Sequence, residues 1–221
     1  MTVFDDFREL LTREGGPPLD VGYGVVAKAV LSAGEETVSL LDREAERSGV
    51  SGASDLMDRL FGSGRIVGDT LTYDDPANSF IHTVLERGIG IPLTMSVVAI
   101  EVGRRVGVRL LPVGMPGHFL LADAAVHGRF YDPFNGGAVL DVDGCRSLYH
   151  ATTGLKDWQD DFLRPVSNRV VFARLLTNLK SSYRRREQLG RLRAVMALRA
   201  RFPEFAEREA GEFARLMRPL N

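Results

Sequence analysis

The most regular hydrophobic pattern in the chain lies between Pro92 and Val106. Apolar side chains recur there three and four positions apart, as on the buried face of an α-helix: Leu93, Met95, Val98, Ala99, Val102 and Val106. The charged residues of the segment fall on the other side: Glu101, Arg104 and Arg105. Proline suits a first helical position, because its ring presets φ and the amide hydrogen that it lacks has no partner there. We therefore predict a helix that starts at Pro92 and ends before Gly107 as its C′ residue.

Short strands are predicted after this helix, where the period of the apolar positions changes. Residues 108–111 predict a first strand, which Pro112 closes, and Pro116-Gly117 marks a turn. A second strand, HFLLAD (118–123), follows the turn. A third, GRFYDPF (128–134), is expected to return antiparallel to the second strand as a hairpin.

This hairpin is expected to bring a histidine and an aspartate together. If its loop is 124–126, His118 faces Asp132 and Leu120 faces Phe130. Opposed residues on one face have Cβ atoms about 4.5 to 5.5 Å apart, so an imidazole and a carboxylate can form a hydrogen bond there. Such a bond fixes the tautomer of the imidazole and stabilises its cation, as in a catalytic triad. A register shift of one residue would place the two side chains on opposite faces.

Helical patterns lie on both sides of this central segment. On the N-terminal side we expect helices over residues 3–11, 19–32, 34–48, 53–61 and 76–85. Asn78 can cap the last of these helices or line a site. On the C-terminal side, residues 138–143 can add a strand and 148–163 form a connector, before helices over 167–183, over 187–201 and after Pro203.

The charge of the chain is balanced overall but unevenly distributed. The composition, with 44% hydrophobic and 26% charged residues, is that of an ordinary globular protein. The formal net charge of −1 gives no overall attraction to nucleic acid or to an acidic membrane. Residues 1–60 hold 12 acidic and 6 basic residues, whereas 164–221 hold 5 acidic and 14 basic ones. We therefore expect the two ends of the chain to attract each other.

Cysteine content and hydropathy indicate a cytoplasmic protein. The single cysteine, Cys145, excludes an internal disulfide and fits a reducing compartment. The N-terminus is acidic and has no apolar segment of the kind found in a signal peptide. No apolar run approaches the roughly 18 residues of a membrane span.

Four motifs, in this order along the chain, carry a resemblance to a known family: NSF (78–80), GIP (90–92), PGHF (116–119) and DPF (132–134). Over roughly residues 19–203 the chain resembles the transglutaminase-like superfamily, specifically its SirB branch. The resemblance implies an α+β fold with a papain/transglutaminase-like core over 71–150, in which a central helix packs on a small antiparallel sheet. It also implies an N-terminal helical segment (1–70) packed on that core and a C-terminal tetratricopeptide-like helical tail (164–221). Three helices are too few for a free-standing solenoid, so we expect the tail to pack on the core.

The resemblance also implies candidate site residues and one departure from the family. In the wider superfamily a Cys at the start of a helix is the nucleophile, a strand His is the base, and an Asp on the next strand orients it. His118 and Asp132 match the His and the Asp, but the Cys would fall near Pro92. Members of the SirB branch commonly lack this Cys. Thr94 or Ser96 would be a much weaker nucleophile, because a hydroxyl needs a strong base at the moment of attack.

Two classes of function follow from these residues. The favoured one is a transglutaminase-fold protein without thiol catalysis, a cytoplasmic pseudoenzyme that acts as a binding or regulatory module. Its cleft would include Asn78, Pro92 and Ser96 around His118, and its partner would be a protein or peptide. The alternative is a hydrolase or acyltransferase for amide or ester bonds, in which His118 is a general base oriented by Asp132 and acts on water, an amine or Thr94.

Other partners and cofactors are not favoured by the sequence. Arg184-Arg185-Arg186 is a charge run that we interpret as a solvated loop between helices, with nucleic-acid contact as the minor alternative. A zinc site of His82, His118, His127 and Asp132 can be drawn, but neither HxxxH nor CxxC spacing occurs. We expect no cofactor, no metal and no membrane contact. Cys145 is interpreted as a small buried hydrophobe.

Overall fold

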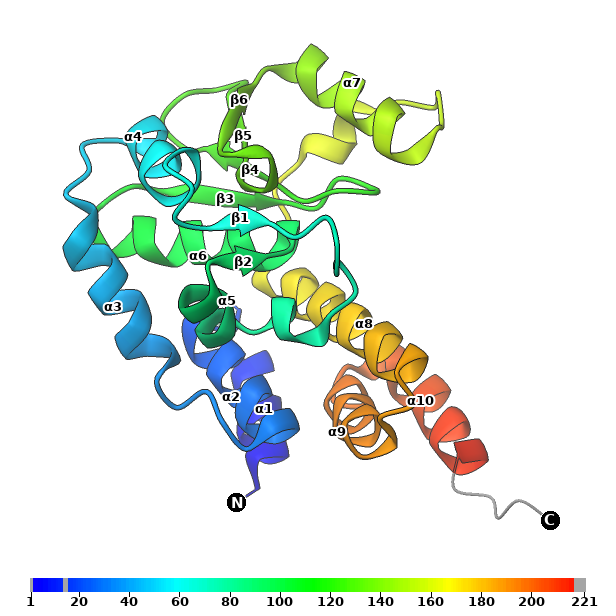
Figure 1. Cartoon of the computed structure of the whole chain (residues 1–221). Helices are drawn as coiled ribbons and strands as arrows, with labels where there is room; N and C mark the ends of the chain where they lie inside the picture. The colour runs from blue at the N-terminus through cyan, green and yellow to red at the C-terminus, as the bar shows by residue number, and fades with distance from the viewer. Residues whose placement is uncertain (1, 14–15, 217–221) are drawn as a thin grey trace.

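The computed structural model describes residues 2–13 and 16–216, without the side chain of Leu216. Its centre is helix α6 (Pro92–Arg105), which begins at Pro92 as predicted. Other helices contact α6 on one side, and strands of a small sheet contact it on the other (Figure 1). Met95, Val98 and Val102 of the apolar face are fully buried. The hydrophobic pattern of the sequence therefore predicts the central element correctly.

The helices before α6 pack against it and against one another. They are α1 (Val3–Leu11), α2 (Leu19–Leu31), α3 (Thr37–Ser48), α4 (Ala53–Met57), a π-helical turn (Asp58–Gly62), a 3₁₀-helix (Pro76–Ser79) and α5 (Ile81–Arg87). Two very short strands, β1 (Val67–Gly68) and β2 (Ile89–Gly90), pair in parallel and were not expected from the sequence. They join the segment before the 3₁₀-helix to the start of α6.

The single helix predicted over 76–85 is wrong, because the structure has two helices there. Phe80, with φ −113° and ψ 124°, is extended and separates the 3₁₀-helix Pro76–Ser79 from α5. The side chain of Asp75 accepts a hydrogen bond from the Ala77 amide at 3.0 Å and so starts the first helix. Apolar periodicity runs through both pieces and does not reveal one extended residue between them.

Four antiparallel strands form the sheet that packs on α6. In chain order, which is also their order in the sheet, they are β3 (Leu110–Val113), β4 (Leu120–Asp123), β5 (Phe130–Asp132) and β6 (Ala138–Leu140). One face belongs to the large core that includes α6 and presents Leu110, Leu121 and Tyr131. The other face carries a second apolar cluster that includes Val113, Leu120, Phe130, Cys145 and Tyr149.

The register of the β4–β5 hairpin differs by two residues from the prediction. Leu121 pairs with Tyr131 and Ala122 with Phe130, whereas the predicted loop pairs Leu120 with Phe130. The loop is longer, because the Asp123 carboxylate accepts a hydrogen bond from the Ala125 amide at 2.9 Å and holds a wider turn. A shift of two residues leaves every side chain on its original face. The predicted common face of His118 and Asp132 is therefore retained.

The connector predicted over 148–163 is also wrong in its first part. Strand β6 ends at Leu140, and helix α7 spans Val142–Thr153 and covers the outer face of the sheet (Figure 1). Asp141 starts the helix, because its carboxylate accepts a hydrogen bond from the Gly144 amide at 2.8 Å. After α7, a 3₁₀-helix at Asp160–Leu163 leads into the C-terminal helices.

The C-terminal helices pack on the rest of the chain through apolar contacts. They are α8 (Asn168–Arg185), α9 (Leu189–Arg199) and α10 (Pro203–Leu216). The Phe7 ring of α1 lies 5.8 Å from the Phe172 ring of α8, centroid to centroid, and Tyr23 of α2 lies 5.7 Å from the same ring. Within the described residues, no ion pair joins an acid of 1–60 to a base of 164–216. None of the described helices is both long and apolar enough to cross a membrane.

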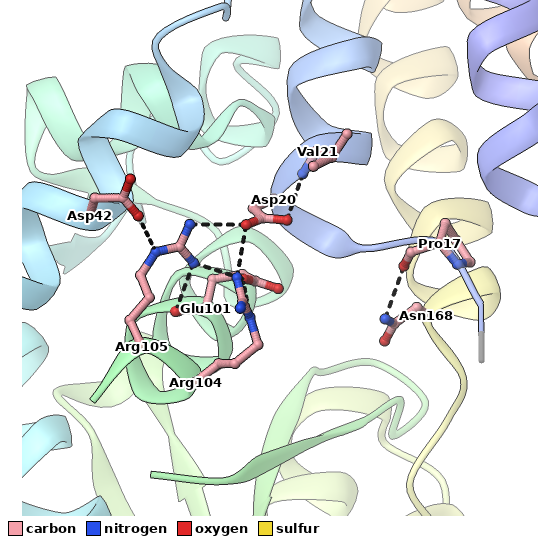
Figure 2. A network of polar contacts seen from close by, with 8 residues as sticks. All are labelled: Pro17, Asp20, Val21, Asp42, Glu101, Arg104, Arg105 and Asn168. Carbon is pink, nitrogen blue, oxygen red and sulfur yellow. Dashed lines mark hydrogen bonds and ion pairs between the residues drawn. The ribbon is translucent and has the colours of Figure 1, made fainter. Parts of the chain in front are cut away.

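A partly buried ionic network joins α6 to the N-terminal helices (Figure 2). The Arg105 guanidinium donates to Asp42 of α3 at 2.6 Å, to Asp20 of α2 at 2.9 Å and to Glu101 of α6 at 2.9 Å. Burial, together with the nearby charge of Asp20, raises the pKa of Glu101, while the hydrogen bonds from Arg104 and Arg105 oppose this. Arg105 therefore neutralises carboxylates on three helices at once.

We predict that Arg105→Ala lowers the free energy of unfolding by about 3 kcal/mol, because Asp20 and Glu101 would remain buried without this counter-charge. The neighbouring Arg104 is the matched control. Its side chain is 59% exposed, against 11% for Arg105, although it contacts the same two carboxylates. Arg104→Ala should cost less than about 1 kcal/mol. Urea denaturation measures the free energy of unfolding of both variants. Equal losses of stability would show that the burial of Arg105 does not increase its contribution.

Candidate functional site

The structure brings His118 and Asp132 into direct contact. The Nε2 atom of His118 lies 2.9 Å from Oδ1 of Asp132, and both side chains are buried. His118 lies just before β4 and Asp132 ends β5, so neighbouring strands position the pair. The other ring nitrogen, Nδ1, has no hydrogen-bond partner among the described residues and is not fully buried either. The pair therefore presents one free nitrogen of the imidazole.

Asp132 is held by the backbone that follows it. Its Oδ1 atom accepts hydrogen bonds from the amides of Phe134 at 3.1 Å and Asn135 at 3.3 Å, and its Oδ2 atom accepts one from the Asn135 side chain at 2.6 Å. In each of these contacts the Asp132 carboxylate is the acceptor. In its contact with His118 the carboxylate accepts a hydrogen bond from Nε2–H, which leaves the lone pair of the ring on Nδ1.

A tight turn positions His118. The His118 amide donates to the Met115 carbonyl at 3.2 Å across Pro116 and Gly117. Gly117 has φ +77°, which suits the third position of a type II turn and favours glycine there. A Cβ atom on Gly117 would also lie 2.8 Å from the Thr153 methyl group of α7. Glycine at position 117 is therefore favoured both by the turn and by the close approach of α7.

A cleft of about 520 Å³ opens beside His118. Its walls come from four parts of the chain: Thr70 and Tyr73 before the 3₁₀-helix, Pro92 of α6, Phe134 and Asn135 after β5, and Leu148 and Thr152 of α7. The Phe134 ring lies 6.0 Å from the His118 ring in an edge-to-face arrangement. One basic nitrogen thus faces a largely apolar cleft with an aromatic wall.

The start of α6 meets this cleft at Pro92 and not at Thr94. Successive residues of an α-helix are rotated by about 100°, so Thr94 points about 200° away from Pro92. Thr94 is fully buried and lies close to Tyr23 of α2. Ser96 lies one turn below Pro92, also fully buried and without a hydrogen-bond partner among the described residues. The cleft therefore reaches no hydroxyl of α6.

Asn78 holds the loop that carries Thr70 and Tyr73. Its side-chain nitrogen donates to Asp69 at 2.8 Å and to the Thr72 carbonyl at 3.0 Å. Burial alone would raise the pKa of Asp69, but hydrogen bonds from Thr72, Asn78 and Leu71 lower it to about 2. Asn78 is itself fully buried, so the structure places it behind the cleft wall rather than in the cleft.

Cys145 lies on α7, inside the apolar cluster between that helix and the sheet. Burial, together with the charges of Asp141 and Asp132, raises the pKa of its thiol to about 12. In the described part of the chain the thiol makes no hydrogen bond to the imidazole of His118. The remaining histidines line no part of the cleft, and among the described residues no three His, Cys, Asp or Glu side chains gather as metal ligands do.

Sequence reasoning missed several residues of the cleft. Phe134 and Asn135 belong to the DPF motif and the turn after it, but only Asp132 was selected there. The α7 wall carries a helical period, Val142, Cys145, Leu148, Tyr149 and Thr152, that could have been recognised. Nothing in the sequence placed Tyr73 beside His118, because their proximity depends on the loop that Asp69 and Asn78 hold.

The fold and the site define a mixed helical protein with small sheets, in which a buried His–Asp pair faces a cleft at the start of the central helix. The chain belongs to the transglutaminase-like superfamily, whose family model matches residues 27–177. The matched region runs from α2 into α8 and so includes the whole cleft.

Similar proteins come from bacteria and from animals. A UPF0162 protein of Xylella fastidiosa is 39% identical over 116 residues, which cover 50% of this chain and 41% of that protein. A UPF0162 protein of Pseudomonas aeruginosa is 35% identical over 107 residues, covering 48% and 38%. F-box only protein 21 of Mus musculus is 33% identical over 133 residues, covering 55% and 20%. The chain thus spans less than half the length of each of these relatives, and no solved structure matches it.

We predict that Cys145 resists thiol reagents as long as the chain is folded. The thiolate is the reactive form, and a pKa of about 12 makes it rare at mildly alkaline pH. Labelling by Ellman's reagent should be at least about 1,000-fold slower in the native chain than in denaturant, where an ordinary thiol pKa applies. Rapid labelling of the native chain would contradict this placement of Cys145.

Proposed function

We propose that the chain is a non-catalytic binding or regulatory module of the SirB branch, which binds a protein or peptide segment in the cleft beside His118. In this proposal residues 71–150 form a papain/transglutaminase-like core without the nucleophilic Cys. Residues 1–70 are an N-terminal helical segment packed on it, and 164–221 are a tetratricopeptide-like tail. The carrying observation is that Pro92 lines the cleft, and the resemblance to the family puts the nucleophilic Cys near this position.

The chemistry of the cleft supports a peptide ligand. Tyr73 and Phe134 form an edge-to-face pair with ring centroids 6.1 Å apart, and Leu148 adds an aliphatic wall. The polar groups are few: the Nδ1 atom of His118, the Asn135 side chain, and the hydroxyls of Thr70 and Thr152. Apolar walls with a few fixed polar groups are typical of ligand sites, where the walls supply affinity and the polar groups fix orientation.

We predict that Tyr73→Ala weakens peptide binding at least about 10-fold, because the ring is a main apolar wall of the cleft. Peptides selected on an immobilised array would be titrated by calorimetry against wild type and variant. Leu71→Ala is the matched control, since Leu71 lies on the same loop but is 94% exposed and outside the cleft. Unchanged affinity in Tyr73→Ala would show that the peptide binds outside the cleft. If no peptide on the array binds specifically, the proposal of a peptide-binding module is wrong.

A second candidate function is a hydrolase or acyltransferase for amide or ester bonds. It is favoured by the free Nδ1 atom of His118 and by the hydrogen bonds that hold Asp132 against Nε2, which together suit a general base acting on water. The first backbone amides of α6 have no acceptor within the helix and could stabilise an oxyanion. Under this candidate the water, rather than a side chain, is the nucleophile.

We predict for this candidate that His118→Gln lowers turnover of a responsive ester or amide by about 10²-fold or more, the usual contribution of a general base. A fluorogenic ester and amide library supplies the substrates. The variant Thr94→Val distinguishes two possible nucleophiles. Loss of turnover would identify the Thr94 hydroxyl as the nucleophile, and unchanged turnover would identify water. Equal turnover by wild type and His118→Gln would eliminate the candidate.

A further inference from the structure

Arg174 of α8 is a partly buried cation without an anionic partner in the described part of the chain. Its Nη1 and Nη2 atoms lie 3.4 and 3.3 Å from the Met115 carbonyl oxygen, and its guanidinium lies 5.3 Å from the centroid of the Phe119 ring. No described carboxylate lies within ion-pair distance of it. One carbonyl and one ring therefore occupy only part of its five donors.

The fold treats its other buried cations differently. Arg105 contacts three carboxylates, and Arg199 and Lys180 both contact Glu209, at 2.7 and 2.6 Å. Arg174 has no such compensation from the described residues, and its burial lowers the pKa of the guanidinium. Partly burying an unpaired charge is unfavourable. A cost of this kind is typical of a functional position, where a ligand supplies the missing charge.

Arg174 does not itself line the cleft but lies next to residues that do. The carbonyl that it contacts, that of Met115, also accepts the hydrogen bond from the His118 amide. On the other side it lies near Tyr73, which lines the cleft and acts on the pKa of Arg174. Tyr73 cannot serve as a counter-ion at neutral pH, because burial raises the pKa of its phenol further. Arg174 thus lies close to two sides of the cleft wall, the turn before His118 and the Tyr73 ring.

We propose that Arg174 binds a carboxylate of the peptide held in the cleft, so that the module selects an acidic side chain or a free C-terminus. This inference rests on the proposed function and names the class of its ligand. The two Nη atoms face the Met115 carbonyl, which leaves the edge formed by Nε and one Nη for a bidentate contact. A planar fork of two parallel N–H groups matches a carboxylate, whereas lysine offers only a point charge.

The first experiment tests the anion site without any peptide. The ¹⁵Nε signal of Arg174, assigned by its loss in Arg174→Lys, is followed while sodium acetate is added, with sodium chloride and sodium phosphate at equal ionic strength as comparisons. A saturable shift with acetate that chloride does not produce is expected. The Nε signal of Arg193, an exposed arginine of α9, is the internal control and should follow ionic strength alone. A linear acetate response at Arg174 equal to that of Arg193 would overturn the inference, and a saturable response to phosphate alone would overturn its carboxylate class.

The second experiment uses peptides bound by the full chain. Each is compared as free acid and C-terminal amide, and with an internal Glu replaced by Gln. One of these changes should weaken binding by about 10-fold in wild type and have no effect in Arg174→Met. Arg193→Met should keep the wild-type preference. If peptides bind with the same affinity whatever their charge, the role proposed for Arg174 is wrong and the proposed function still stands. An acetate response without any peptide ligand would reject the peptide and retain a carboxylate site.

A stability measurement separates binding from a structural role. Met has a similar length and no charge, and the Met115 carbonyl keeps the His118 amide as donor in its presence. Arg174→Met should therefore leave the urea midpoint unchanged or raise it, as often follows when a poorly compensated buried charge is removed. A clear fall of the midpoint together with an unchanged peptide preference would assign Arg174 to the fold instead.

Discussion

The contact of Arg105 with three carboxylates is the interaction on which the arrangement of the helices depends. Asp20, Asp42 and Glu101 come from three helices, and only a side chain with several donors in a fixed plane can meet all three (Figure 2). Hydrophobic contact alone would let α2 and α3 slide along α6, because it has no direction. The guanidinium fixes their position at the C-terminal end of α6, and the other end of the same helix carries Pro92 into the cleft.

The shape of the cleft depends on a second set of polar contacts, in which carboxylates accept hydrogen bonds from backbone amides. Asp132 binds two amides after β5 and Asp69 binds two amides in the loop before the 3₁₀-helix, and each also holds an asparagine side chain. Each carboxylate thereby orders a short segment that has little regular structure of its own. The aromatic walls, Phe134 and Tyr73, lie on these segments, so their positions follow from the same hydrogen bonds.

The parts of this structure that could be predicted are those governed by a local period. The α6 helix follows from apolar positions three and four apart, and the common face of His118 and Asp132 follows from the period of two along strands. The two-residue change of register depends on the loop conformation held by Asp123, which no period encodes. The role proposed for Arg174 is still harder to predict from sequence, because only the assembled fold shows that no described carboxylate pairs with it.

The proline at the start of α6 and the His118–Asp132 contact are stabilised independently of each other. Proline favours the first position of a helix, so Pro92 stabilises α6 independently of the chemistry of the cleft. The His118–Asp132 contact is supported independently, by a turn on one side and by capping of the following 3₁₀-helix on the other. Neither support uses a group at Pro92. The geometry of the His118–Asp132 contact therefore does not depend on the residue that starts α6. Our proposal of a binding module uses this property, because polar groups that are fixed before a ligand arrives lower the cost of binding.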